Sequence, residues 1–305
     1  MAFTAADVKN LREMTGVGMM DCKKALAASE GDMDKAVEYL REKGLAASAK
    51  KAGRIAAEGM AYACVIDGVG VVVEVNAETD FVGKNEKFVD FVKGVANTVA
   101  KEAPVDLDAL MGCKFDGGSQ TVTEQQQEMV LVIGENIKVR RFARYADGVS
   151  VPYIHAGGKI GVLVNLAVEG DASSQVLEMG KDLAMQIAAL NPRFWDKAEV
   201  TEDVLAEEKK IMLAQMDNDP KMASKPAQVK EKIVAGKIDK FYAENCLLQQ
   251  DFVKDNSMTV EQYMASVAKA AGVKVTLRSA TRFEKGEGIE KKQEDFAAEI
   301  ASMIK

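Results

Sequence analysis

The sequence is poor in the side chains that most often bind metals or carry out catalysis. It contains a single histidine, His155, and four cysteines that lie far apart in the chain. None of the cysteines forms a CxxC pair, and one histidine is too few to complete a zinc site with them. We therefore expect reduced thiols, no bound metal and no cofactor. The cysteines are Cys22, Cys64, Cys113 and Cys246.

Long apolar runs and an excess of basic residues are also missing. No apolar segment approaches the length that crosses a membrane, and the N-terminal residues contain neither a charged leader nor an apolar stretch. The formal net charge of −7 argues against nucleic acid as the main partner, because phosphate binding usually requires a surplus of Lys and Arg. We expect a soluble, cytoplasmic protein with no membrane attachment and no direct nucleic-acid partner.

Motifs of known catalytic sites are missing as well. No GxSxG elbow or Cys–His signature surrounds His155. The run Gly157-Gly158-Lys159-Ile160 lacks the upstream glycine and the Ser or Thr of a phosphate loop, so it predicts a hairpin turn. Because no catalytic group has a recognisable partner, we expect that the protein is not an enzyme.

The residues that are present predict a globular α+β protein of several domains. The chain of 305 residues is 48% apolar and 29% charged, with five prolines. Apolar residues recur at three- and four-residue spacing in some segments, as in helices, and alternate in others, as in strands. The predicted parts are a three-helix domain at 1–54, a first core subdomain at 55–148, a second core subdomain at 149–195 and 251–283, an antiparallel helical hairpin at 196–250, and a C-terminal helical module at 284–305.

The N-terminal domain is predicted to contain three short helices, which resemble a ubiquitin-associated-type fold. Thr4 and Asp32 are predicted N-caps of the first and third helices, and alanine-rich residues 45–57 predict a helical linker. Met19 and Met20 begin the second helix. Flexible thioethers are frequent at binding surfaces, but core packing is the usual role of methionine, so the residues taken alone predict that both lie in the core.

Each core subdomain begins with a strand hairpin followed by a helix. The first hairpin turns near Asp67-Gly68 and the second near Gly157-Gly158, which suggests two related subdomains. Between them, Thr123 and Gln126 predict a capping box. The alternation over 137–145 predicts a strand, which we assign to the second sheet.

Two segments have roles that the sequence leaves open. The helical hairpin, a coiled-coil-like pair reversing at Asp219-Pro220, serves either as plain structure or in self-association, because its thin apolar stripes bury little area alone. The C-terminal segment places Phe296, Ile300 and Met303 on one helix face, which either docks on its own domain or reaches a partner.

Residues 74–84 join an alternating strand to an amphipathic helix. The pattern predicts a half-buried strand with Val75 on one face and Glu74 on the other. We expect Thr79 to cap the following helix and Asp80 to lie in its first turn. Phe81 either extends the apolar helix stripe that includes Phe88, or points off the helix end as an exposed aromatic.

Residues 74–84 closely resemble the signature of bacterial elongation factor Ts, the guanine-nucleotide exchange factor for elongation factor Tu. Residues 11–26 and 282–291 also look like that family, and the resemblance extends over essentially the whole chain. Mild departures are Ala77, Gly83 and a connector at 104–119 that is longer than in many relatives. Gly83 is expected to loosen the first helical turn by about 1 kcal/mol relative to alanine.

The resemblance implies that Phe81 inserts into the G domain of elongation factor Tu, near its magnesium ion, and that GDP then leaves. It favours the exposed position of Phe81 over the core position. By sequence alone, a satisfied hydrogen bond in a strand is the simpler role of His155. The implied exchange residues are Thr79, Asp80, Phe81 and Val82, and the implied partner-facing residues are Met19, Met20, Lys23, Ile133, Gly134, His155 and Val253.

The resemblance implies elongation factor Tu, GDP-bound or nucleotide-free, as the partner. The sequence leaves open whether the chain is a monomer, a homodimer or part of a two-by-two complex. The alternative function is a non-exchanging adaptor, dimeric through its hairpin, whose N-terminal helices bind another chain.

Overall fold

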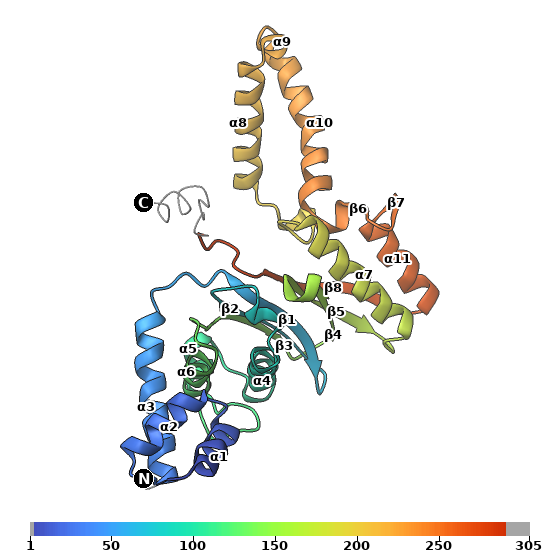
Figure 1. Cartoon of the computed structure of the whole chain (residues 1–305). Helices are drawn as coiled ribbons and strands as arrows, with labels where there is room; N and C mark the ends of the chain where they lie inside the picture. The colour runs from blue at the N-terminus through green and yellow to red at the C-terminus, as the bar shows by residue number, and fades with distance from the viewer. Residues whose placement is uncertain (1–2, 291–305) are drawn as a thin grey trace. The chain divides into compact units, whose positions relative to one another are not determined.

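The computed structural model describes residues 3–290, and the chain divides into two compact units. Of the described residues, the first unit holds 3–144, 154–161 and 283–290, and the second holds 145–153 and 162–282. Both contain helices and strands (Figure 1), which confirms the α+β class. The amphipathic helix expected around Phe296, Ile300 and Met303 lies outside the described residues.

Three N-terminal helices form a small core in the first unit. Helix α1 begins with a capping box, in which the Thr4 hydroxyl accepts a hydrogen bond from the Asp7 amide and the Asp7 carboxylate accepts one from the Thr4 amide. Asp32 caps α3, which continues to Lys51 without a separate linker helix. Residues of helix α6 (Val122–Ile133) pack against this core, so the three helices belong to the same unit as the first sheet. The helices are α1 (Ala5–Thr15), α2 (Met19–Ala28) and α3 (Met33–Lys51).

The first sheet has the strand order β1-β2-β3. Strands β1 and β2 pair antiparallel with Ala61 opposite Glu74. The assignment of 137–145 to the second sheet was wrong, because β3 pairs with β2. Alternation shows that a segment is a strand but does not identify its neighbour. The elements are β1 (Glu58–Ile66), β2 (Val69–Ala77), α4 (Glu86–Glu102), α5 (Leu107–Gly112), α6 (Val122–Ile133) and β3 (Lys138–Tyr145).

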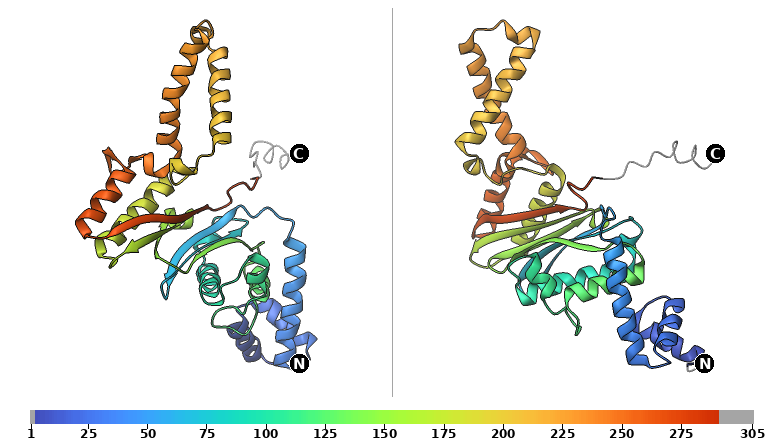
Figure 2. Two further views of the ribbon diagram at one scale, coloured as in Figure 1. Left: turned by 180° about the vertical axis from the view of Figure 1, so that it is seen from behind. Right: turned by 90° about the vertical axis from the view of Figure 1, so that its left-hand side faces the viewer.

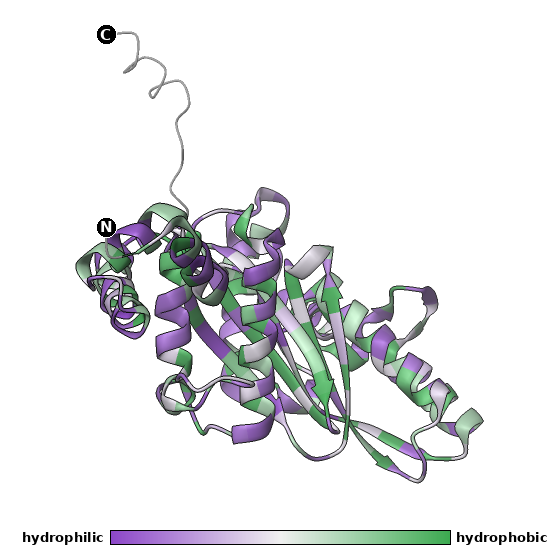
Figure 3. Cartoon of the chain, turned by 60° about the horizontal axis from the view of Figure 1, so that its bottom comes forward, coloured by the Kyte–Doolittle hydropathy of each residue, from purple (hydrophilic) through white to green (hydrophobic). Residues whose placement is uncertain are grey.

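One face of this sheet packs on α4, as Figure 1 shows. Buried valines of β2 meet buried Phe88 and Phe91, and Figure 3 shows how hydrophobic the strands are. Helix α6 starts two residues earlier than expected, because its capping box uses Thr121 and Glu124. The Thr123 hydroxyl instead donates to the Met111 carbonyl at 2.8 Å.

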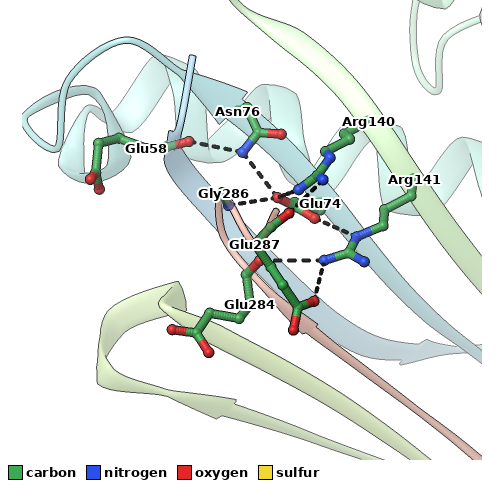
Figure 4. A network of polar contacts seen from close by, with 8 residues as sticks. All are labelled: Glu58, Glu74, Asn76, Arg140, Arg141, Glu284, Gly286 and Glu287. Carbon is green, nitrogen blue, oxygen red and sulfur yellow. Dashed lines mark hydrogen bonds and ion pairs between the residues drawn. The ribbon is translucent and has the colours of Figure 1, made fainter. Parts of the chain in front are cut away.

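The other face of β2 is buried as well, so the expectation of a half-buried strand was wrong. The Glu74 and Asn76 side chains on this face are buried, under the segment that begins at Phe283. Both Glu74 oxygens are used (Figure 4): Oε1 accepts from Asn76 Nδ2, Arg140 Nη1 and the Gly286 amide, and Oε2 accepts from Arg141 Nε. We call Glu74, Asn76, Arg140, Arg141 and Gly286 the Glu74 cluster.

The second unit repeats the order hairpin, helix and third strand. Its main sheet has the strand order β4-β5-β8, and a short strand pair and a helix precede β8. Thr259 and Gln262 form the capping box of that helix. Residues 154–161 and 283–284, which include η2 and one end of each of β4, β5 and β8, belong to the first unit. The elements are β4 (Val149–His155), η2 (Ala156–Gly158), β5 (Ile160–Glu169), α7 (Ser174–Leu190), η4 (Leu247–Gln249), β6 (Asp251–Phe252), β7 (Asp255–Thr259), α11 (Val260–Ala271) and β8 (Lys274–Glu284).

Two long helices of the second unit run side by side in opposite directions (Figures 1 and 2). The chain reverses at Asp219 and Pro220, where the sequence placed the turn. Val234, Ile238 and Phe241 are buried, whereas Ile211 remains 42% exposed. The hairpin therefore buries only a narrow apolar stripe. Its elements are η3 (Lys197–Glu199), α8 (Glu202–Asn218), α9 (Pro220–Ala223) and α10 (Ala227–Asn245).

None of the helices within residues 3–290 is both long enough and apolar enough to span a lipid bilayer.

Two helical glycines allow a matched test of the packing of α4. A Cβ atom at Gly94 would lie 2.1 Å from Phe115 Cζ, whereas a Cβ at Gly236 in α10 meets nothing within 4 Å. We expect Gly94→Ala to lower the free energy of unfolding by about 1–3 kcal/mol, because the ring must move. Gly236→Ala should raise it by about 0.5–1 kcal/mol. Urea unfolding measures both, and equal stability of the two variants would contradict this packing.

Acid titration tests the Glu74 cluster. Burial favours neutral Glu74, but hydrogen bonds to the charged form outweigh burial and hold the pKa of Glu74 below its ordinary value of 4.5. The resulting stabilisation is complete above that ordinary value and disappears as the pH falls through the lowered pKa. We expect Glu74→Gln to cost about 3–5 kcal/mol near neutral pH, and the difference from wild type to shrink below pH 4.5. A difference independent of pH in urea unfolding would show that the charge is not involved.

Candidate functional site

Residues 78–84, which we call the tip, form a turn between β2 and α4 rather than the start of a helix. Residues Val82–Lys84 make a 3₁₀ turn, and the N-cap of α4 is Asn85, whose Oδ1 accepts from the Lys87 amide at 3.0 Å. The expectations that Thr79 caps α4 and that Asp80 lies in its first turn were therefore wrong. The Thr79 hydroxyl has another partner, which fixes the tip differently.

The carboxylate of Glu135 holds the first residues of the tip. Glu135 Oε2 accepts hydrogen bonds from the amides of Glu78 at 3.1 Å and Thr79 at 3.0 Å, and Oε1 accepts one from the Thr79 hydroxyl at 2.6 Å. In return, Glu78 Oε1 accepts from the Asn136 amide at 2.6 Å and from Arg54 Nη1 at 3.3 Å. Charged acceptors make the stronger class of hydrogen bond, so Glu135 and Glu78 restrain the backbone at the base of the tip.

Phe81 and Val82 point in opposite senses. Val82 is 5% exposed and belongs to the hydrophobic core of the first sheet, whereas Phe81 is 82% exposed. The alternative in which Phe81 extends the core stripe of Phe88 was therefore wrong. Asp80 beside it is also exposed. The tip thus exposes one aromatic ring and one carboxylate. Its backbone is held on one side by the hydrogen bonds of Thr79 to Glu135 and on the other by the burial of Val82.

The two unusual small residues near the tip lie in close contacts. Ala77 is fully buried at the end of β2. Gly83 lies in the 3₁₀ turn and not in the first turn of α4, and a Cβ atom there would approach the Gly59 carbonyl oxygen to 3.0 Å. Glycine therefore lets the tip lie tightly against the start of β1.

Met19 and Met20 begin α2, and both are on the surface. Their exposed fractions are 52% and 63%, so the core role was wrong for both, and Lys23 on the next turn is exposed too. The loop that precedes α2 is connected to the first turn of α4, because Lys87 Nζ donates to the Gly16 carbonyl at 3.0 Å. The methionines and the tip thus belong to neighbouring parts of one unit.

The remaining partner-facing candidates are distributed over both units. Ile133 is partly buried against the core of the first sheet, and Gly134 ends α6 in a left-handed conformation with φ of 87°. His155 is exposed at the end of β4, within the first unit. Val253 belongs to the second unit, is 48% exposed, and its amide donates to Gln186 Oε1 at 2.8 Å.

Sequence reasoning missed the residues that hold the tip. Glu135, Asn136 and Arg54 are distant from the tip in sequence, and no local pattern connects them with it. One signal was available: Gly134 is a typical helix C-cap, and a charged residue, Glu135, follows it directly, three positions before β3 begins at Lys138.

Two remaining groups of side chains are the possible metal ligands and the thiols of residues 3–290, the part of the chain that the structure describes. There, no three His, Cys, Asp or Glu side chains cluster so as to hold a metal ion. Burial raises the pKa of Cys64 to about 11, and burial with nearby carboxylates raises that of Cys246 to about 11. Both thiols are therefore protonated near neutral pH and poor nucleophiles.

Comparison with known proteins identifies the family. A sequence model described as "Elongation factor TS" matches residues 78–287, which begins at the first residue of the tip and covers more than half of the chain. The chain belongs to the elongation factor Ts family. Elongation factor Ts of Syntrophotalea carbinolica is 47% identical over 307 residues, covering 100% of both chains. That of Trichlorobacter lovleyi is 49% identical, covering 99% of this chain and 98% of the relative, and that of Clostridium perfringens strain SM101 is 49% identical, covering 98% of each.

Removal of the Glu135 side chain tests the order of the tip. In Glu135→Ala, the Glu78 and Thr79 amides lose their acceptor. Hydrogen bonds to charged groups contribute about 1.5–3 kcal/mol, so these amides should exchange with solvent roughly tenfold to a hundredfold faster. Hydrogen exchange followed by mass spectrometry measures the effect. Glu102→Ala, at an exposed carboxylate of the same unit, serves as the control, and an equally small effect of both variants would contradict the assigned role.

Proposed function

We propose that this chain binds elongation factor Tu with bound GDP and promotes the release of GDP and its exchange for GTP. The observation that carries the proposal is Phe81, an aromatic side chain 82% exposed on a backbone fixed by Glu135. Membership of the elongation factor Ts family supplies the partner and the nucleotide.

The proposed mechanism acts on the nucleotide site of the partner. Elongation factor Tu holds GDP through a cradle of backbone amides and a magnesium ion. The tip enters the G domain near that ion, and Phe81 separates side chains of the partner. Asp80 fixes the tip and disturbs the groups that organise the magnesium ion. Thr79 and Val82 keep the ring and the carboxylate in position, so that the cradle shifts and GDP leaves.

The magnitude of the effect follows from the burial of one ring. Full burial of a phenylalanine side chain stabilises the complex by about 1.5–3 kcal/mol, which changes nucleotide affinity by roughly tenfold to a hundredfold. Larger effects require the rest of the interface. Linkage requires that nucleotide binding weaken the affinity for this protein by the same factor.

Further contacts of the proposed complex come from both units. The exposed side chains of Met19, Met20 and Lys23 belong to the helical N-terminus, which we regard as a ubiquitin-associated-like domain. We include the hairpin as a dimerisation element, giving a homodimer or a two-by-two complex. The protein acts in the cytoplasm, holds no cofactor of its own and is not an enzyme. The other partner-facing residues are Ile133, Gly134, His155 and Val253.

A second candidate function is a non-exchanging adaptor. It is supported by the exposed methionines of the N-terminal helices, which include Met14 at 65% exposure. A cavity of about 520 Å³ between these helices and α6, lined by Val37, Leu40 and Leu131, also favours it. An adaptor would bind elongation factor Tu or another chain through these helices without changing the rate of GDP release.

Substitution of Phe81 tests the exchange function. We expect Phe81→Ala to lower the maximal rate of GDP release by roughly tenfold or more, because the ring no longer inserts. Its thermal unfolding should match wild type, because the side chain is exposed. Stopped-flow fluorescence of a labelled GDP on elongation factor Tu measures the rate at saturating concentrations of this protein.

Val105→Ala is the matched control, because Val105 is 90% exposed in the same unit but lies outside the tip. It should release GDP as fast as wild type. Normal release by Phe81→Ala would remove the wedge from the mechanism. A wild-type protein that binds without accelerating release would favour the adaptor.

A further inference from the structure

The segment from Phe283 to Ile289 covers the polar face of β2, as Figure 4 shows for its central residues. Its Gly286 amide donates to the buried Glu74 carboxylate at 2.8 Å, and its Lys285 amide donates to the Lys159 carbonyl at 2.9 Å. Gly286 has φ of 72°, and a Cβ atom there would lie 2.0 Å from the Ala57 carbonyl oxygen. Only glycine fits, so this segment lies directly on the backbone that leads into β1.

The Glu74 cluster balances its charges across three separate parts of the chain. Glu74 is fully buried, and Arg140 and Arg141 from β3 both bind it. Arg141 also pairs with Glu287 at 3.0 Å, and Arg140 Nη2 donates to the Glu287 carbonyl at 2.6 Å. Two carboxylates thus meet two guanidiniums. A buried carboxylate needs this full set of partners, so the C-terminal segment is part of the site that Glu74 requires.

Two sets of contacts, one on β2 and one on β1, connect the Glu74 cluster and the C-terminal segment with the tip. On β2, Asn76 Nδ2 donates both to Glu74 and to the Glu58 carbonyl, and the tip begins at residue 78, two positions further along the chain and directly after the strand ends at Ala77. On β1, Glu58 pairs with Lys285 of the C-terminal segment, while the neighbouring Gly59 carbonyl lies against Gly83 of the tip. The start of β1 is therefore in contact with the C-terminal segment and with the tip.

We propose that the C-terminal segment 283–289, bound through Glu74, positions the exchange tip. Glu74 and Gly286 are positioning residues: they touch no partner in this account, but they fix the strands from which the tip projects. The role of this segment in nucleotide exchange rests on the proposed function. Its effect on the position of the tip does not depend on that function.

Two variants break the same contact from opposite sides. Glu74→Gln removes the buried charge, and Gly286→Ala prevents the close approach to Ala57. Glu102→Gln is the matched control, because it changes an exposed carboxylate of the same unit that lies outside the contacts of Glu74 and Glu287. Should both test variants fail to fold, Arg141→Lys keeps the positive charge but loses the planar pair of donors, and it tests the same link more mildly.

Three readouts on the full chain are expected to change together in both variants. Trypsin should cleave after Lys285 about tenfold faster, and the amides of residues 78–79 should exchange with solvent about tenfold faster, as for the loss of a hydrogen bond to a charged group. The maximal rate of GDP release from elongation factor Tu should fall severalfold in the folded protein. The Glu102→Gln control should match wild type in all three.

Faster cleavage with unchanged amide exchange in the tip would overturn the proposal, since the cluster would then only attach the C-terminal segment. Unchanged cleavage in both variants would overturn it as well. If wild type fails to accelerate GDP release, the proposed function is wrong, but cleavage and amide exchange still decide whether the segment positions the tip.

Discussion

The first unit depends on one buried carboxylate. Glu74 lies in the central strand of a three-stranded sheet whose other face is filled by valines and α4. A charge in such a place is costly unless it is paired and hydrogen-bonded. Its donors come from β2, from β3 and from residue 286, so the unit is complete only when distant parts of the chain have come together.

This constraint explains why the first unit contains both ends of the described chain. An apolar sheet face could be covered by any hydrophobic segment. The face of β2 that contains Glu74 instead requires a segment that brings a backbone amide close to the strand. Gly286 provides it, because its left-handed backbone and missing side chain allow the approach. Buried ion pairs of this kind add little net stability, but they specify one arrangement over others.

The tip shows a division of roles within neighbouring residues. Val82 is held by the core, Thr79 by Glu135, and Phe81 by neither. Fixing the backbone around an exposed ring lowers the conformational entropy that a complex must lose, which is the general advantage of a preorganised binding element. Gly83 contributes because its missing side chain lets the tip pack closely against the Gly59 carbonyl.

Local patterns predicted much of the fold but not its long-range pairings. The caps at Thr4 and Asp32 were predicted correctly, because their partners lie within one helical turn. Thr79 was misassigned because its partner, Glu135, is remote in sequence. The sheet of β3 was misassigned for the same reason. The exposure of Phe81 stayed open because its spacing from Phe88 fits a helix stripe, and only the 3₁₀ turn at Val82–Lys84 separates the two.

The most direct test of the account is a multiple-turnover measurement of nucleotide release. Elongation factor Tu loaded with a fluorescent GDP analogue is mixed with excess unlabelled nucleotide and a substoichiometric amount of this protein. The account predicts that all of the labelled GDP leaves in one accelerated phase whose rate is proportional to the amount of protein added. Binding without acceleration, or release limited to one GDP for each molecule added, would contradict it.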